Sequence, residues 1–95
     1  MERKEIERKV SEFLISEFEV DESLIRPEAR LHEDLGIDSL DVVDIVVLVD
    51  QIFGFRIVPE ELIPVVTLND FCDYVERKIN QKKENVNSIN DAKAE

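Results

Sequence analysis

The sequence predicts a small all-α domain built from four helices, three long and one short. Apolar residues recur at helical spacing in long segments, and only two glycines and three prolines interrupt the 95 residues. With 43% hydrophobic residues, the chain is long enough to bury one modest core. We therefore expect a single domain over residues 1–80, followed by a polar and flexible tail over residues 81–95.

The first helix is predicted over residues 3–17, where apolar side chains lie three and four positions apart among charged ones. The pattern then dissolves from Glu19 to Asp34, with Pro27 in the middle. A loop of this length is uncommon in a compact domain and usually has a functional reason. Its apolar residues are expected to anchor it to the core, and they are Val20, Leu24, Ile25, Leu31 and Leu35.

The second helix is predicted from Ser39 to Phe53. Asp38 is a favourable N-cap, and Asp41 three residues later completes a capping-box-like pair near the positive helix end. Gly54 is a natural residue to end the helix, because glycine readily adopts the left-handed conformation of a C-cap.

Two further helices are expected in the second half of the chain. A short one from Glu60 to Ile63 lies between two prolines, and a longer one begins after Thr67, which is a good N-cap with Asp70 three residues on. The apolar stripe of this last helix ends at Ile79. The polar, asparagine-rich sequence that follows predicts the tail.

The second helix has two faces when its residues are placed about 100° apart. Exposed apolar residues among acids suit docking to a partner with basic residues around an apolar pocket, although isolated apolar residues are also common on protein surfaces. The side expected to face the core holds Val42, Ile45, Val46, Val49 and Phe53. The opposite side holds Leu40, Asp44, Val47 and Gln51, with Asp41 and Leu48 on its flank.

The charge of the chain excludes several classes of partner. With 23 acids against 12 bases, the net charge is −11, so phosphate backbones and anionic membrane surfaces repel the chain.

The start of the chain lacks the apolar core of a signal peptide, and no apolar run approaches membrane-spanning length. A single cysteine, Cys72, lies on an apolar stripe and is expected to be a buried structural thiol. We expect a cytoplasmic protein that binds neither nucleic acid nor membrane.

Ser39 is the residue whose chemistry needs an explanation. Nucleophilic catalysis is not expected, because no G-x-S-x-G elbow, His–Asp pair or oxyanion-hole glycines accompany it. The lone His32 is expected to make a loop contact. The nearby acids lack the D-x-D-x-D-G spacing of a calcium loop. A hydroxyl at a helix N-terminus suits attachment of a phosphate group by another enzyme, although helix capping alone explains most serines at such positions.

The stretch LGIDSLDVVDIVVLVDQIFGFRIVPEEL resembles the core of carrier proteins, in which a D-S-L motif opens the second of four helices. The resemblance spans residues 3–80 and implies a four-helix bundle of acyl-carrier type with a long first loop. It implies that Ser39 receives 4′-phosphopantetheine from coenzyme A through a phosphopantetheinyl transferase. The terminal thiol of that group would hold an acyl group as a thioester.

The same resemblance implies further roles along the second helix. The protein would be no enzyme itself. It would be a monomeric substrate of the transferase and of acyl-loading and acyl-transfer enzymes with basic docking surfaces. The implied recognition residues are Asp34, Asp38, Leu40, Asp41, Asp44, Val47 and Asp50. The candidates to line an acyl pocket are Val42, Val43, Val46, Val49 and Phe53.

Some positions depart from the housekeeping fatty-acid pattern. Gln51 and Ile52 stand where acids are usual, and Val58 is an extra residue before Pro59. The run I-D-S-L-D-x-x-D-I-V with F-G-F-R-I resembles dedicated carriers that deliver long acyl chains to lipid A. We therefore expect a carrier for fatty-acid or specialised lipid biosynthesis. The alternatives are a discrete polyketide, peptidyl or D-alanyl carrier, or an acidic protein-interaction module without a cofactor.

Overall fold

The computed structural model describes the backbone of residues 1–93 and the side chains of residues 1–81. Within this range the fold is helical and contains no β-strand, which confirms the predicted all-α class. The elements in chain order are α1 (Arg3–Phe18), the 3₁₀ helix η1 (Glu22–Leu24), α2 (Ser39–Phe53), the 3₁₀ helix η2 (Pro59–Leu62) and α3 (Leu68–Lys93).

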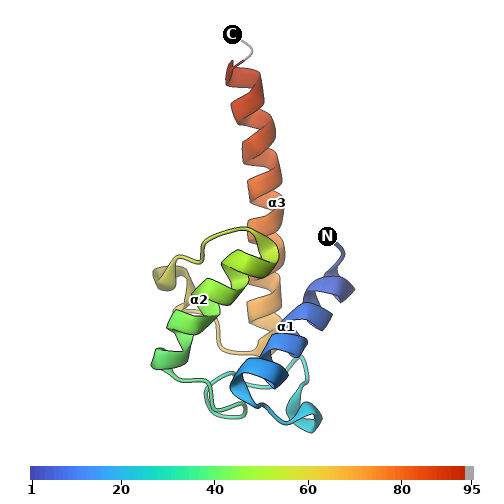
Figure 1. Cartoon of the computed structure of the whole chain (residues 1–95), viewed down its shortest axis with the longest axis vertical. Coiled ribbons are helices and arrows are strands. Elements are labelled where there is room, and N and C mark those ends of the chain that lie inside the picture. The colour runs from blue at the N-terminus through green and yellow to red at the C-terminus, as the bar shows by residue number, and fades with distance from the viewer. Residues whose placement is uncertain (94–95) are drawn as a thin grey trace.

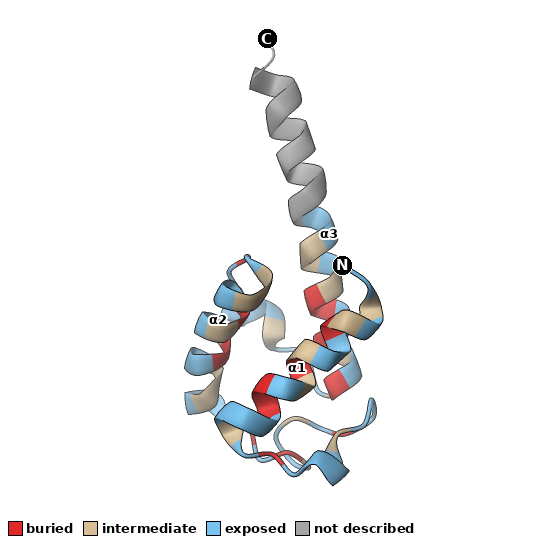
Figure 2. Ribbon diagram, turned by 45° about the vertical axis from the view of Figure 1, so that its right-hand side comes forward, coloured by how far each residue is buried: buried red, intermediate tan, exposed pale blue. Residues whose placement is uncertain are grey.

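The three α-helices enclose a single apolar core (Figure 1). The segment between α1 and α2 closes the end of the bundle where α1 ends and α2 begins. In Figure 2 the buried positions of each helix face the other helices, while the outward positions are exposed. The buried side chains are Ile6, Val10, Phe13 and Leu14 of α1, Ile45 and Val49 of α2, Leu68, Phe71, Cys72, Tyr74 and Val75 of α3, and Val20, Ala29, Leu35, Ile37, Phe55 and Ile57 of the connections.

Helix α2 has the predicted bounds because both of its ends carry local signals. Asp38 caps its N-terminus, and Gly54 ends it in the left-handed conformation with φ of 78°. Of the five residues expected to face the core, Ile45 and Val49 are buried. Val42, Val46 and Phe53 are only half-buried. The core contact of α2 therefore consists of two buried residues, with the half-buried Val46 and Phe53 packed against the core beside them.

The connection between α1 and α2 is tied to the segment before α3 by backbone hydrogen bonds. The Leu31 amide donates to the Val66 carbonyl at 2.9 Å, and the Leu68 amide donates to the Ala29 carbonyl at 2.8 Å. An isolated antiparallel bridge joins Arg30 to Thr67. These bonds fix the connection to the start of α3.

The prediction that Leu24 anchors this connection to the core is wrong, because Leu24 lies in the exposed turn η1 and is 38% exposed.

A 3₁₀ helix, η2, stands where the sequence predicted a short helix over residues 60–63. Pro59 occupies its first turn, where the missing N–H of proline has no cost. Pro64 follows two residues after its end, so the segment is restricted to a single turn.

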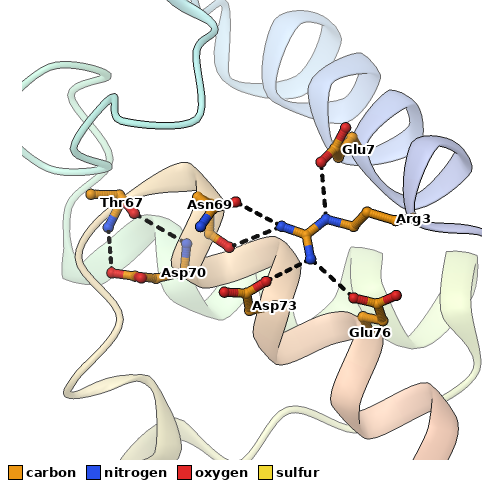
Figure 3. A network of polar contacts seen from close by, with 7 residues as sticks. All are labelled: Arg3, Glu7, Thr67, Asn69, Asp70, Asp73 and Glu76. Atoms are coloured by element: carbon orange, nitrogen blue, oxygen red, sulfur yellow. Dashed lines mark hydrogen bonds and ion pairs between the residues drawn. The ribbon is translucent and has the colours of Figure 1, made fainter.

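A network of polar contacts joins the start of α1 to α3 (Figure 3). The Arg3 guanidinium donates to Asp73 Oδ1 at 2.5 Å and to Glu76 Oε1 at 3.0 Å, both on α3. It also donates to Asn69 Oδ1 at 2.8 Å and to Glu7 Oε2 at 2.9 Å. One side chain therefore connects two helices through four partners, which the sequence pattern did not predict.

The predicted flexible tail, residues 81–95, lies almost wholly outside the described side chains. The backbone of α3 is assigned as helix to Lys93. The flexibility of this tail stays a prediction.

Candidate functional site

The first turn of α2 is closed by a reciprocal capping box. Asp38 Oδ1 accepts hydrogen bonds from the amides of Leu40 at 2.9 Å and Asp41 at 3.1 Å. In return, Asp41 Oδ2 accepts from the Asp38 amide at 3.1 Å. These bonds satisfy orphan donors of the helix end without any contribution from Ser39, the first residue of the helix.

The Ser39 side chain is exposed, and its hydroxyl makes no hydrogen bond to any residue in the described range 1–81. A serine that capped the helix would aim its oxygen at a backbone amide, and here Asp38 has that role. The hydroxyl is therefore accessible to an enzyme that approaches from solvent.

An open cavity of about 320 Å³ lies beside Ser39, between α2, the first connection and the segment after η2. We call it the Ser39 cavity. Its walls are mostly apolar, and its polar residues lie close to Ser39 in sequence. Its volume is at the lower end of the roughly 300–1,000 Å³ that small-molecule sites occupy. The lining residues are Leu31, His32, Glu33, Ile37, Asp38, Ser39, Val42, Ile45, Leu62, Val65, Val66 and Phe71.

His32 is held at this cavity by a loop contact. Its Nδ1 lies 3.0 Å from the Ile37 carbonyl oxygen, two residues before Ser39. A carbonyl oxygen only accepts, so Nδ1 carries the proton in this contact. The predicted loop role of His32 is thereby confirmed.

The five side chains expected along an acyl pocket are placed in different environments. Only Val42 lines the Ser39 cavity. Val49 is fully buried in the core, and Val43 is 65% exposed on the outer side of α2. Val46 and Phe53 are half-buried against the core. The helical period gives the order of these side chains around the axis of α2. It does not say which of them face the core, the cavity or solvent, because that depends on where the neighbouring elements pack.

The outer side of α2 is apolar in its centre and acidic around it. Leu40 is 79% exposed and Val47 is 50% exposed, as the two-face pattern predicted. Val43 joins them, because positions 40, 43 and 47 share one face of a helix. Asp44 and Asp50 are exposed on the same helix. We call Leu40, Val43 and Val47 the α2 apolar face.

Asp34 differs from the other predicted recognition acids because a basic side chain, that of Arg30, engages its carboxylate. Its Oδ2 accepts from the Arg30 amide at 2.8 Å and from the Arg30 guanidinium at 3.4 Å. The backbone hydrogen bond, followed by the side-chain bond, holds the pKa of Asp34 below its usual value. This acid stabilises the turn that leads to Ser39, and its charge is partly balanced by Arg30.

A buried tyrosine that sequence reasoning did not single out connects α3 to η2. Tyr74 is 1% exposed, and its hydroxyl donates to Glu61 Oε1 at 2.7 Å. The Tyr74 hydroxyl oxygen also accepts a hydrogen bond from the Val58 amide at 3.3 Å. The apolar stripe predicted for the last helix does not include this position, and its polar partners depend on how η2 packs against α3.

Cys72 is buried at 2% exposure on α3, as predicted. Burial raises the pKa of its thiol to about 11, since a thiolate is poorly solvated there. The Cys72 thiol is therefore a structural group.

None of the helices in the described range is both long and apolar enough to cross a membrane.

Comparison with known proteins agrees with this geometry. A family profile described as "Phosphopantetheine attachment site" matches residues 8–75. The acyl carrier protein of Rubrobacter xylanophilus is 40% identical over 75 residues, which are 79% of this chain and 93% of the relative. That of Thermotoga maritima is 39% identical over 77 residues, 81% and 95% of the two chains. That of Coprothermobacter proteolyticus is 37% identical over 82 residues, 86% and 100%.

The fold, the exposed serine and the family match define a phosphopantetheine-bearing carrier domain. The chain belongs to the acyl carrier protein family. Its prosthetic group is accordingly 4′-phosphopantetheine, as the resemblance implied. The residues around Ser39 fit such a group, because an unengaged hydroxyl at a helix N-terminus stands beside an apolar cavity.

Proposed function

We propose that Ser39 is the attachment point of 4′-phosphopantetheine and that the protein delivers acyl groups to lipid-biosynthetic enzymes. The observation that supports this most directly is the exposed Ser39 hydroxyl at the mouth of an apolar cavity. When attached, the group supplies a terminal thiol on a flexible arm, to which an acyl group is joined as a thioester. The positive end of α2 favours its phosphate.

The Ser39 cavity is the proposed shelter for the first part of the acyl chain. Burying each methylene in apolar surroundings is worth about 0.8 kcal/mol, so a few carbons are held without being trapped. Val42 and Ile45 form the apolar wall that α2 provides, with Leu62 and Phe71 among the other walls. Val46, Val49 and Phe53 pack in or against the core and are candidates for contact with a longer chain, whereas we assign Val43 to docking.

The architecture proposed for this function is the four-helix bundle of carrier type. In this assignment η2 is the short third helix, and α3 is the fourth. The Ser39 cavity supports this assignment, because Leu62 at the end of η2 and Val65 just after it line the same space as residues of α2.

The partners proposed are a phosphopantetheinyl transferase and acyl-loading and acyl-transfer enzymes with basic surfaces around an apolar contact. The α2 apolar face would make the central contact, and Asp38, Asp41, Asp44 and Asp50 would attract basic residues. Such charge-steered docking weakens as salt concentration rises. In this role the protein is a monomeric cytoplasmic carrier and the substrate of other enzymes, not a catalyst.

An apolar cargo is favoured over a peptidyl or D-alanyl one. Most walls of the Ser39 cavity are aliphatic and aromatic side chains, which offer no hydrogen bonds to a polar cargo, and its polar residues are His32, Glu33, Asp38 and Ser39. We propose fatty-acid or specialised lipid biosynthesis, for example of lipid A, as the pathway. The lipid A assignment is supported by the motif I-D-S-L-D-x-x-D-I-V together with F-G-F-R-I.

The test is the intact mass of the purified apo protein after incubation with coenzyme A and a promiscuous phosphopantetheinyl transferase. We expect one phosphopantetheinyl addition, which Ser39→Ala abolishes without loss of folding. Ser16→Ala is the matched control, since Ser16 is an exposed serine on α1 and should leave the addition intact. A folded wild-type protein that gains no mass would refute the proposal.

A further inference from the structure

One wall of the Ser39 cavity belongs to a segment with few attachments to the rest of the fold. Leu62, Val65 and Val66 line the cavity from the connection between α2 and α3. We call residues 58–66, which include η2, the η2 strap. Because the cavity is small, a chain that outgrows it must displace a wall. The attachments of the strap therefore decide how readily the cavity enlarges.

The far end of the strap is held by backbone hydrogen bonds. The Val66 carbonyl accepts from the Leu31 amide at 2.9 Å, and the Val66 amide donates to Asp70 Oδ2 at 3.2 Å. These bonds join the strap to the first connection and to the capping turn of α3. This end cannot move without breaking the start of a helix.

The near end of the strap is held by a side chain, Tyr74 of α3. Its hydroxyl donates to Glu61 Oε1 at 2.7 Å and accepts from the Val58 amide at 3.3 Å. Lys78 Nζ lies 3.2 Å from the same Glu61 oxygen, on the surface. One hydroxyl thus fastens two points of the strap, one on the backbone and one on a side chain.

Between its two ends the strap is bonded mainly to itself. Among the described residues, the amides of Glu61 and Val65 donate to Val58 and Leu62 of the strap, at 2.9 Å each. Ile63 is 80% exposed, and Leu62 is only half-buried. Few buried apolar contacts and local hydrogen bonds are features of segments that open at low free-energy cost.

Tyr74 is a rigid support for this attachment. Its ring is buried and packs edge-on against Phe55, with centroids 6.2 Å apart. Burial, together with the bond to Glu61, raises the pKa of the Tyr74 hydroxyl to about 12. The hydroxyl therefore keeps its proton at physiological pH and is available as the hydrogen-bond donor to Glu61.

We propose that Tyr74 is a positioning residue that limits the acyl chain length the Ser39 cavity accepts, by fastening the η2 strap through Val58 and Glu61. The inference rests on the proposed function, since it concerns the acyl group attached through Ser39. Release of the hydroxyl contacts frees the near end of the strap, and the wall formed by Leu62 and Val65 then yields to a longer chain.

The variant that tests the fastening is Tyr74→Phe, which removes the hydroxyl and keeps the buried ring. In the apo protein, hydrogen exchange of the Val58 and Glu61 amides should become about tenfold faster, the effect of losing roughly one hydrogen bond. Exchange of the Val49 amide in α2 should not change. Unchanged exchange at Val58 and Glu61 would overturn the fastening, and this result does not depend on Ser39 chemistry.

The test of chain length uses the loaded protein. Acyl groups of increasing length are transferred to the arm, and the rise in melting temperature over the unacylated form is measured for each. In the wild type the rise should stop growing at a limiting length. In Tyr74→Phe this limit should move by about two carbons or more, because the freed wall admits further methylenes. The same limiting length in both proteins would overturn the proposal.

Three further variants separate the fastening from general loss of stability. Glu61→Gln keeps an acceptor for the tyrosine hydroxyl and should behave as wild type, whereas Glu61→Ala should move the limit as Tyr74→Phe does. Ile6→Val removes a buried methylene from α1 with the fastening intact, and it should leave the limit unchanged. A limit shifted equally by Ile6→Val would also overturn the proposal. A wild type that gains no arm would instead refute the attachment at Ser39.

Discussion

Asp38 and Asp41 cap each other across the first turn of α2, each carboxylate accepting from the other's amide at 3.1 Å. The same two acids flank the hydroxyl that we propose is modified. They therefore combine a structural role, which depends on hydrogen bonding, with a recognition role, which depends on charge. These roles separate by mutation, because asparagine caps a helix as well as aspartate does.

Replacement of Asp38 by asparagine should slow loading by the transferase while stability stays within a few tenths of a kcal/mol. Asp38→Ala should slow loading as well and, in addition, lose about 0.5–2 kcal/mol of the free energy of unfolding. Urea unfolding and initial loading rates by mass spectrometry measure the two effects. Glu22→Gln, which removes a charge from η1, is the control. Equal loading rates for Asp38→Asn and wild type would remove this charge from the recognition surface.

Truncation of the α2 apolar face should weaken docking without unfolding the protein. Leu40→Ala and Val47→Ala change side chains that are 79% and 50% exposed, so stability should change by less than about 0.5 kcal/mol. If these residues make the central contact, the transferase kcat/KM should fall about fivefold or more. Leu24→Ala, an exposed leucine in η1, should leave kcat/KM unchanged. A normal kcat/KM for both α2 variants would move the docking site elsewhere.

Removal of the Arg3 side chain should cost far more stability than removal of a surface arginine. Arg3→Ala leaves Asp73 and Glu76 of α3 without their partner, and we expect a loss of about 1–2 kcal/mol. Arg8→Ala breaks one exposed pair with Glu12 and should cost less than about 0.5 kcal/mol. Urea denaturation of both variants at low salt provides the comparison. Equal losses would mean that the network in Figure 3 contributes no more than a single surface ion pair.

Asp70 should make stability depend on pH at the start of α3. Hydrogen bonds from the amides of Thr67 and Val66 hold its pKa below the ordinary value of 3.8. Because the folded pKa is the lower one, this contribution is fully present above pH 3.8 and is lost as the pH falls through the folded pKa.

The measurement compares the wild type with Asp70→Asn by urea unfolding from neutral pH down to about pH 2. Subtracting the stability curve of the variant from that of the wild type cancels the pH-dependent contributions of the other acids, such as Glu61 and Asp34, whose pKa values are also lowered. The stability difference should shrink on acidification. A difference that stays constant would show that the cap does not depend on the charge of Asp70.

Local signals made α2 predictable from the sequence. Asp38, Asp41 and Gly54 act within a turn of the helix end, so the bounds Ser39–Phe53 follow from neighbours along the chain. The exposure of Leu40 and Val47 likewise follows from the helical period alone. The candidate serine was found by its motif, and its free hydroxyl follows from the capping by Asp38.

Contacts between distant segments were not predictable in the same way. The cavity is formed where Leu31, Val42 and Val66 meet, and no periodicity relates these positions. The family resemblance implied Val43 as a pocket candidate, while the structure leaves it 65% exposed on the outer side of α2. The Tyr74 and Arg3 contacts require the packing of α3 against η2 and α1, which depends on tertiary structure.

The burial of Cys72 gives the carrier a practical property. The chain contains one cysteine, and that sulfur is shielded in the core with its pKa raised to about 11. A maleimide dye added to the native protein should therefore label the prosthetic thiol and leave the polypeptide unlabelled. Fluorescence per molecule would then count unacylated arms directly, with no cysteine replacement needed beforehand.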